Sequence, residues 1–211
     1  AGENFCAGMD LGVISRMGSG EGPADEFEKR MLEEPETSLH GWLKTYRPTK
    51  PVIAAVEGYA LAGGLELMIA CDLVVANEGA KFGIPEAKRG LVAAAGGVMM
   101  LPDQIPERIA MELALTGDFI DAARAYELGL INRVVSGSAL EGAKELARKI
   151  AENGPLAVRV SKQILKESRG WSMDERYDKQ AQLIGPVFVS EDAREGAAAF
   201  AEKRKPNWKG K

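Results

Sequence analysis

The stretch Pro51-Val-Ile-Ala-Ala-Val-Glu-Gly-Tyr-Ala-Leu-Ala-Gly-Gly-Leu-Glu-Leu67, which continues to Cys71-Asp72, decides the fold of this chain. Its apolar, β-branched run Val52–Val56 predicts a buried strand. The glycine pair that follows leads into a predicted helix from Leu65 to Cys71. Asp72–Ala76 then predicts a second buried strand. A strand, a glycine-rich turn, a helix and a strand in this order indicate an α/β crossover.

The flanking segments extend this pattern in both directions. Upstream, the glycines and Pro23 within residues 12–38 predict a mobile loop that leads into a polar helix near 24–33. Downstream, Phe82–Glu86 predicts a turn. Further elements are predicted as a helix ended by Gly117, a helix N-capped by Asp121, a strand at Leu130–Val135, and helices at about 139–152, 155–168, 173–188 and 191–203, the last N-capped by Ser190. The chain therefore divides into an α/β core (1–135) and an all-helical region (136–211).

The composition excludes several classes of protein. The chain has 211 residues, a net charge of −4 and a hydrophobic fraction of 45%, so nothing suggests a nucleic-acid partner. No apolar run reaches the roughly 18–20 residues of a membrane span. Cys6 and Cys71 without a CxxC motif, and His40 as the one histidine, argue against a metal cage and against a triad that needs a second histidine. His40 is predicted to be a surface or loop residue. Two thiols in a chain of this size predict a reducing, cytoplasmic location.

The glycine pair Gly63-Gly64 stands between a predicted strand and a predicted helix. Glycines there let backbone N–H groups approach a ligand, and the helix N-terminus favours an anion or an oxygen that becomes anionic. Close packing of the helix on the strand explains the same pair without any ligand. The pair is not a GxGxxG motif and predicts no dinucleotide site.

Two acidic residues are candidates for proton transfer. Glu66 lies in the first turn of the predicted helix, within a strongly apolar segment, where it either caps the helix or sits in a semi-buried cleft. Glu86 follows Pro85 in an apolar turn, and it is either an exposed loop acid or a second catalytic group. Two carboxyls can share one water, one accepting a proton while the other donates. Their spacing along the chain does not show that they meet.

The segment from Pro51 to Asp72, together with Ala80-Lys-Phe-Gly-Ile-Pro-Glu86, Gly90-Leu91 and Gly96-Gly97, resembles the signature of the enoyl-CoA hydratase (crotonase) family. Phe5-Cys-Ala-Gly-Met-Asp-Leu11 resembles the first oxyanion loop of that family. The ending Phe200-Ala-Glu-Lys-Arg-Lys-Pro-Asn-Trp-Lys209 is similar to that of the carnitinyl-CoA dehydratase branch. The match covers nearly the whole chain.

This resemblance implies an α/β fold of ββα units arranged in a spiral, with C-terminal helices that form trimers, often paired into hexamers. It implies that the N–H groups of Ala7 and Gly63 bind the thioester carbonyl as an oxyanion hole. Glu66 would orient and deprotonate the water in hydration, and Glu86 would supply the proton to C2, with the roles reversed in dehydration. Coenzyme A would be part of the substrate, and neither a cofactor nor a metal is implied.

The resemblance also implies contacts to the coenzyme A part of the substrate. Met9, Asp10 and Leu11 fall on the path of the adenine and the pantetheine, and Gly64 is a further candidate. Phe200 is a candidate for the acyl or adenine pocket. Lys203, at a helix end that is otherwise simply solvated, is a candidate for a phosphate contact.

The chain departs from the family pattern at several points. Ala62 replaces the first glycine of a frequent Gly-Gly-Gly, and Val98-Met99-Met100 replaces a polar stretch with arginine. The family has several strands and a helix before the position of Ala7, so the core is expected to lack its N-terminal strands. The two glutamates favour a hydratase or dehydratase. A Δ3,Δ2-enoyl-CoA isomerase that uses one acid near Glu86, or another thioester chemistry of the crotonase family, stays open. So does a catalytically incomplete, oligomeric scaffold that binds coenzyme A without turnover.

Overall fold

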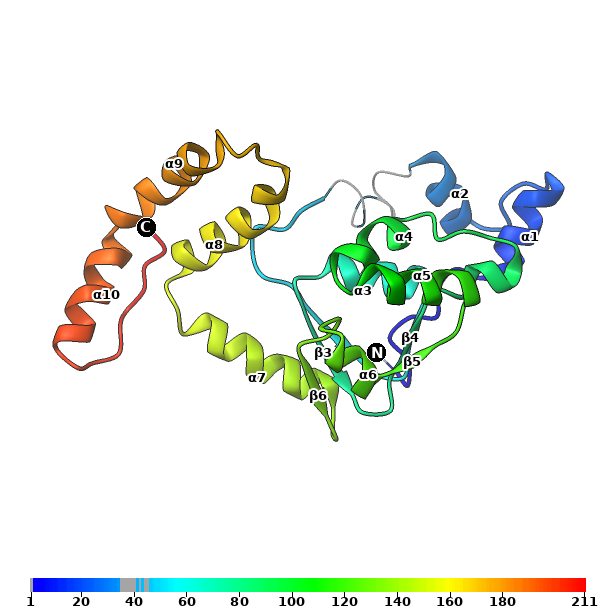
Figure 1. Ribbon diagram of the computed structural model, residues 1–211, viewed down its shortest axis with the longest axis horizontal. Coiled ribbons are helices and arrows are strands. Elements are labelled where there is room, and N and C mark those ends of the chain that lie inside the picture. The colour runs from blue at the N-terminus through cyan, green and yellow to red at the C-terminus, as the bar shows by residue number, and fades with distance from the viewer. Residues whose placement is uncertain (1, 35–40, 42, 44–45) are drawn as a thin grey trace. The chain divides into compact units, whose positions relative to one another are not determined.

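The computed structural model describes residues 2–34, 41, 43 and 46–211 (Figure 1). The chain forms two compact units. The first comprises Ala1–Arg47 and Val52–Ala143, and the second comprises Pro48–Pro51 and Lys144–Lys211. His40, predicted to be a surface or loop residue, lies outside the described residues. The division at residue 135 into a core and an oligomerisation region stays a prediction.

Two small sheets organise the first unit. One has the strand order β1-β3-β6 and is parallel, and the other has the order β2-β4-β5. In the second sheet β2 and β4 are parallel, while β5 runs antiparallel to β4. The strands are β1 (Ile53–Val56), β2 (Tyr59–Leu61), β3 (Leu73–Asn77), β4 (Lys81–Gly83), β5 (Ile120–Asp121) and β6 (Arg133–Val135).

Helices gather beside these sheets, and α3, α4 and α5 are drawn together above the strands in Figure 1. The α-helices that begin in the first unit are α1 (Leu11–Ser19), α2 (Glu26–Glu33), α3 (Gly63–Ala70), α4 (Gly97–Met100), α5 (Glu107–Thr116), α6 (Ala122–Glu127) and α7 (Ala139–Ala151), with short 3-10 helices η2 (Pro85–Arg89) and η3 (Leu101–Asp103). The core lies between the helices and the strands. Phe82, Leu65, Met68, Ile84 and Leu101 are among its fully buried side chains.

Most of the predicted elements of the first unit are confirmed. Strands form within Val52–Val56 and next to Asp72, and Asp121 caps α6 by accepting a hydrogen bond from the Arg124 N–H. The helix predicted from Leu65 also forms, but it already begins at the glycine pair, which lies in its first turn. The loop predicted from residue 12 is wrong at its start, because α1 occupies Leu11–Ser19. Strand β2 was not predicted, and only part of the Phe82–Glu86 turn is irregular, since β4 ends at Gly83.

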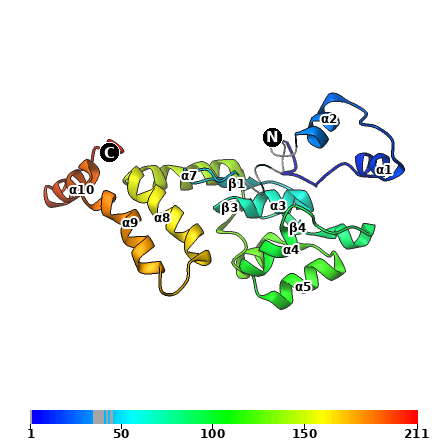
Figure 2. The same ribbon diagram turned by 90° about the horizontal axis from the view of Figure 1, so that it is seen from above.

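The second unit is helical, as predicted, and its helices follow one another along the chain in Figure 2. They are α8 (Pro155–Glu167), η4 (Ser168–Gly170), α9 (Arg176–Phe188) and α10 (Glu191–Ala201). The side chain of Ser190 caps α10, which confirms that prediction. Among the described residues, no helix is both long enough and apolar enough to cross a membrane.

The tail after α10 folds back onto the second unit. Buried Asp192 accepts hydrogen bonds from the backbone N–H groups of Lys209 and Gly210, at 2.6 and 2.9 Å. The Trp208 indole N–H donates to the carbonyl oxygen of Glu152 at 2.8 Å. The Arg204 guanidinium beside Glu195 lowers the pKa of that carboxyl to about 2.

A close approach of two backbones fixes the start of the first unit. Cys6 forms a parallel bridge with Ala60 of β2, so that the chain before Ala7 adds a short further segment to the sheet. Gly64, in the first turn of α3, faces this segment. A methyl group on Gly64 would overlap the carbonyl oxygen of Cys6. Close packing therefore requires glycine at position 64.

Replacing Gly64 with alanine is expected to destabilise the first unit strongly. The added methyl group meets backbone atoms of Cys6 that cannot rotate away, so the cost should be about 1–3 kcal/mol or more. Thermal unfolding measures it. Gly185→Ala in α9 is the matched control, because no atom lies within 4 Å of a methyl group there. A Gly64→Ala protein that melts with the wild type would contradict this packing.

Candidate active site

Three chain segments that run in parallel end at one edge of the second sheet. The Phe5-Cys6 backbone pairs with β2, and β2 pairs in turn with β4 in the register Leu61↔Gly83. Ala7, Gly63 and Glu86 follow the ends of these three segments within a few residues. Ligands of sheets with parallel strands bind beyond the carboxyl ends of the strands. This edge of the sheet is therefore where a ligand site is expected.

The two predicted backbone donors lie on neighbouring loops. The Cys6 N–H donates to the Tyr59 carbonyl at 2.9 Å and the Leu61 N–H donates to the Cys6 carbonyl at 3.0 Å, so that the ladder ends just before Ala7. Gly8 then lies against the start of α3, with its Cα 3.8 Å from a methyl group built on Gly63. Within the described part of the chain, neither the Ala7 N–H nor the Gly63 N–H donates to a protein acceptor. Both are free to bind an oxygen atom.

Glu66 is a buried acid in an apolar helix, with 5% of its surface exposed. Its Oε1 accepts hydrogen bonds from the backbone N–H groups of Ala95 and Gly97, both at 2.8 Å. These two donors fix the orientation of the carboxyl. Its Oε2 lies 3.9 Å from a methyl group built on Gly63 and thus faces the donor end of α3. The interpretation of Glu66 as a solvent-exposed helix cap does not fit this burial.

Glu86 is half-buried in the first turn of η2. Its Oε2 is buried and has no hydrogen-bond partner among the described residues. Burial raises the pKa of this carboxyl, the hydrogen bond from its own backbone N–H opposes the rise, and the negative charge of Glu66 adds to it. The pKa of an acid rises in this way when its charged form loses water and meets a like charge.

Gly117–Phe119, which follow α5, hold the η2 turn from outside. A methyl group built on Gly117 would lie 3.2 Å from the Cα of Pro85. The Lys88 ammonium, two residues after Glu86, pairs with Asp118 at 2.6 Å and lies 6.0 Å from the centre of the Phe119 ring. The turn that carries Glu86 is therefore anchored on both sides, by β4 before it and by this contact after it.

The structure thus brings four of the predicted residues to one edge, namely Ala7, Gly63, Glu66 and Glu86. The two carboxyls lie close enough for the charge of Glu66 to raise the pKa of Glu86, although their spacing in the sequence gave no sign of this. Such an arrangement can stabilise an oxyanion with two N–H donors and can move protons with two acids. Their catalytic roles stay predictions at this point.

The other predicted contact residues are placed differently. Met9 and Leu11 are about half exposed, and the exposed Asp10 accepts a hydrogen bond from the Gly12 N–H at 2.7 Å, at the start of α1. Gly64 is buried against Cys6, as the packing explanation of the glycine pair requires. Phe200, which is 88% exposed, and Lys203 belong to the second unit. None of these positions tests a contact with a substrate.

The sequence interpretation missed the groups that hold Glu66. The N–H donors of Ala95 and Gly97 lie in a run of small residues, Ala93-Ala-Ala-Gly-Gly97. A methyl group on Gly97 would come within 3.1 Å of Glu66 Oε1, so small residues are needed for the approach. The run itself was the available signal, since small residues allow a backbone to approach a buried carboxyl.

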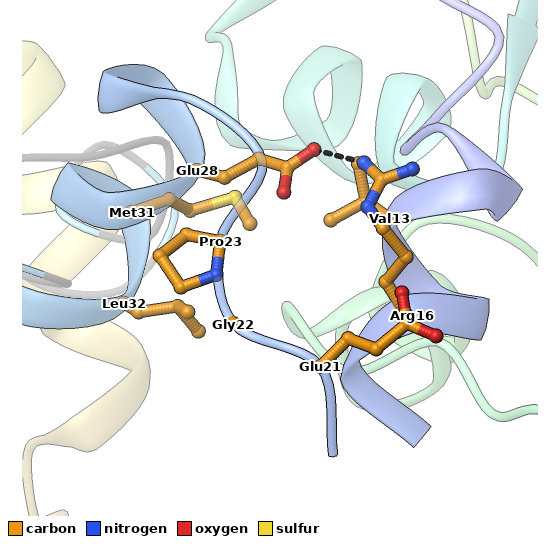
Figure 3. Close-up of a pocket in the computed structure, with 8 residues that line it drawn as sticks. All are labelled: Val13, Arg16, Glu21, Gly22, Pro23, Glu28, Met31 and Leu32. Atoms are coloured by element: carbon orange, nitrogen blue, oxygen red, sulfur yellow. Dashed lines mark hydrogen bonds and ion pairs between the residues drawn. The ribbon is translucent and has the colours of Figure 1, made fainter. Parts of the chain in front are cut away.

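A separate pocket lies between α1 and α2, lined by residues such as Val13, Pro23 and Met31 (Figure 3). An ion pair between Arg16 and Glu28 closes it, and its lining includes none of the predicted site residues. Among the described residues, no group of three His, Cys, Asp or Glu side chains could hold a metal ion.

Residues 1–211 match the family described as enoyl-CoA hydratase/isomerase. The chain is 45% identical over 209 residues to the enoyl-CoA hydratase EchA19 of Mycobacterium tuberculosis, covering 99% of this chain and 76% of that protein. It is 40% identical over 217 residues to the carnitinyl-CoA dehydratase of Proteus mirabilis, covering 100% of this chain and 79% of that protein. The crystal structure of the enoyl-CoA hydratase EchA1 from Mycobacterium marinum superposes with a TM-score of 0.84 at 53% identity. The match covers 100% of this chain and 79% of that chain.

The fold and the relatives that the chain resembles define a lyase-type enzyme of the crotonase class. The chain belongs to the enoyl-CoA hydratase/isomerase family. The resemblance inferred from the sequence and the crotonase fold are confirmed. Hydratase and dehydratase chemistry is common to the named relatives.

Replacing Glu86 with glutamine is expected to stabilise the protein at neutral pH but not in acid. A carboxyl with a raised pKa holds its proton more tightly in the folded state, so its unfavourable contribution appears as pH rises through that pKa. Thermal unfolding at about pH 3.5 and pH 8, on either side of the range of a partly buried glutamate, measures the difference. Glu78→Gln, at an exposed position, is the control. An equal Tm shift at both pH values would contradict the raised pKa.

Proposed function

We propose that the chain hydrates 2-enoyl-CoA thioesters or dehydrates 3-hydroxyacyl-CoA thioesters. The observation that carries this proposal is the pair Glu66 and Glu86 beside two unpaired N–H donors. Addition of water at C3 of an enoyl thioester builds negative charge on the thioester oxygen, which the N–H groups of Ala7 and Gly63 would stabilise. Each N–H donor matters to the rate, because the loss of one donor from such an oxyanion hole typically lowers the rate by about 10²–10³.

The two acids are suited to different parts of the reaction. Glu66, oriented by Ala95 and Gly97, keeps Oε2 towards Gly63 and would take a proton from the attacking water. The raised pKa of Glu86 keeps more of this carboxyl protonated, as a proton donor to C2 requires. Dehydration would reverse both transfers. The names of the relatives, an enoyl-CoA hydratase and a carnitinyl-CoA dehydratase, agree with this chemistry.

Coenzyme A enters this proposal as part of the substrate, with no separate cofactor. Met9, Asp10, Leu11 and Gly64 would contact it from the first unit. Met9 and Leu11 present exposed apolar surface beside the Ala7 donor, as a pantetheine arm requires. Phe200 and Lys203 stay proposed contacts to coenzyme A, through apolar surface and a positive charge, in this chain or in a neighbouring copy. A cytoplasmic location would supply such substrates.

Glu66→Gln and Glu86→Gln are each expected to lower kcat for an enoyl-CoA by about 10²–10⁴, because each removes one partner in proton transfer. Loss of the enoyl-thioester absorbance measures the rate. Glu78→Gln again serves as the control, since this acid is exposed and lies in the turn between β3 and β4.

Other outcomes of this experiment separate the remaining functions. Full activity in both variants would end the hydratase proposal. Loss in Glu86→Gln alone, measured with 3-enoyl-CoA, would identify an isomerase that uses one acid. Binding of coenzyme A without turnover by the wild type would identify a scaffold.

We further propose that the helical unit assembles the chain into trimers or hexamers. Neither α8 nor α9 has a fully buried residue within the chain. Large apolar side chains on these helices and beside them are exposed by 70% or more, among them Leu165, Met173, Tyr177 and Phe188. Apolar surface of this kind marks a contact with another protein surface.

The mass of the protein by light scattering is expected to correspond to three or six chains. Phe188→Asp should lower it, because a charge at a packed apolar position opposes association. Glu167→Gln, at an exposed polar position at the end of α8, should leave the mass unchanged. A monomer at every concentration of the wild type would refute the assembly.

A further inference from the structure

Ala62 has a backbone conformation that residues with a side chain rarely adopt. Its φ is 52° and its ψ is −127°, immediately before the donor residue Gly63. Within the described part of the chain, Lys203 is the one other non-glycine residue with a positive φ. A Cβ atom raises the energy of this conformation, which glycine adopts freely. Ala62 therefore carries a backbone strain that glycine would avoid, and the contacts around it must hold this conformation.

The backbone of Ala62 connects the two elements of the structure that carry the acids Glu66 and Glu86. Its N–H donates to the Gly83 carbonyl at 3.0 Å, at the end of β4 and three residues before Glu86. Its carbonyl accepts the Glu66 N–H at 3.1 Å, in the first turn of α3. Both hydrogen bonds depend on the same pair of backbone angles. A change in the conformation of Ala62 therefore moves both acids relative to each other.

The methyl group of Ala62 reaches the third element of the site. A methyl group built on Gly8 would lie only 2.7 Å from the Ala62 Cβ, so the two residues are in direct contact. Gly8 follows the Ala7 donor. The methyl group thus fills the space between the loop of one donor and the turn of the other, which glycine at position 62 would leave open.

We propose that Ala62 is a positioning residue that sets the spacing of the two oxyanion donors and their place relative to Glu66 and Glu86. This inference rests on the proposed function, which assigns the N–H groups of Ala7 and Gly63 to the thioester oxygen. The strained backbone persists because its contacts to Gly83, Glu66 and Gly8 hold it. Relief of the strain should therefore loosen the site rather than improve it.

Ala62→Gly is expected to lower kcat on the order of tenfold, less than the loss of a whole donor, because both donors stay but their spacing is no longer held. KM should change little, since the contacts to the coenzyme A part are unaffected. The Tm should hold or rise, because glycine removes the strain.

Ala147→Gly, at an exposed position in the middle of α7, is the matched control. The same chemical change there weakens a helix and should lower the Tm while leaving kcat unchanged. Ala62→Gly is thus expected to lower kcat without lowering the Tm, whereas Ala147→Gly is expected to lower the Tm without changing kcat. A merely structural role of Ala62 would make it behave as Ala147 does.

A readout without turnover keeps this inference distinct from the proposed function. The infrared carbonyl stretch of a bound saturated acyl-CoA, labelled with carbon-13 at the thioester, reports polarisation by the two donors. In Ala62→Gly it should lie at a higher frequency than in the wild type. An unchanged frequency together with an unchanged kcat would overturn the positioning role. If the wild type has no hydratase activity but the carbonyl frequency still differs between the wild type and Ala62→Gly, the positioning role is supported and the proposed function is rejected.

Discussion

The parallel pairing of Cys6 with β2 is the contact on which the candidate active site depends. It aligns two chain segments that are more than fifty residues apart, so that both end at the same edge of the sheet. Gly64 permits this pairing because a side chain there would overlap the Cys6 backbone. Without the pairing, the Ala7 and Gly63 N–H groups would belong to unrelated loops. The donors can therefore act on one oxygen atom only because the backbone packs closely at Gly64.

Backbone groups also position the acids. Two N–H donors from a run of small residues hold Glu66, and a hydrogen bond from Ala62 ties the start of α3 to the end of β4, from which Glu86 follows. Main-chain donors are costly to leave unpaired when they are buried, and the carboxyl of Glu66 accepts those of Ala95 and Gly97. The same bonds therefore stabilise the fold and orient the site.

Periodicity and capping residues were sufficient to predict most of the helices, including α6 with Asp121 and α10 with Ser190. They failed for β2, which has three residues between glycine-rich turns, and for α1, where glycines suggested a loop. The donors of Ala95 and Gly97 are backbone groups, so their one signal in the sequence is the run of small residues around them, which names no chemistry. The meeting of Glu66 and Glu86 follows from the β2–β4 register, which tertiary packing decides.

The two carboxyls have unequal surroundings, and a reversible proton transfer needs that inequality. One oxygen of Glu66 is occupied by two N–H donors, whereas a buried oxygen of Glu86 has no partner among the described residues. Desolvation raises the pKa of Glu86, and the charge of Glu66 raises it further, so the Glu86 carboxyl holds its proton more tightly than a free glutamate does. A pair with one proton already in place can give it to carbon while the other carboxyl takes one from water. The same pair, after the transfer, is ready for the opposite direction, because each acid then holds what the reverse step requires.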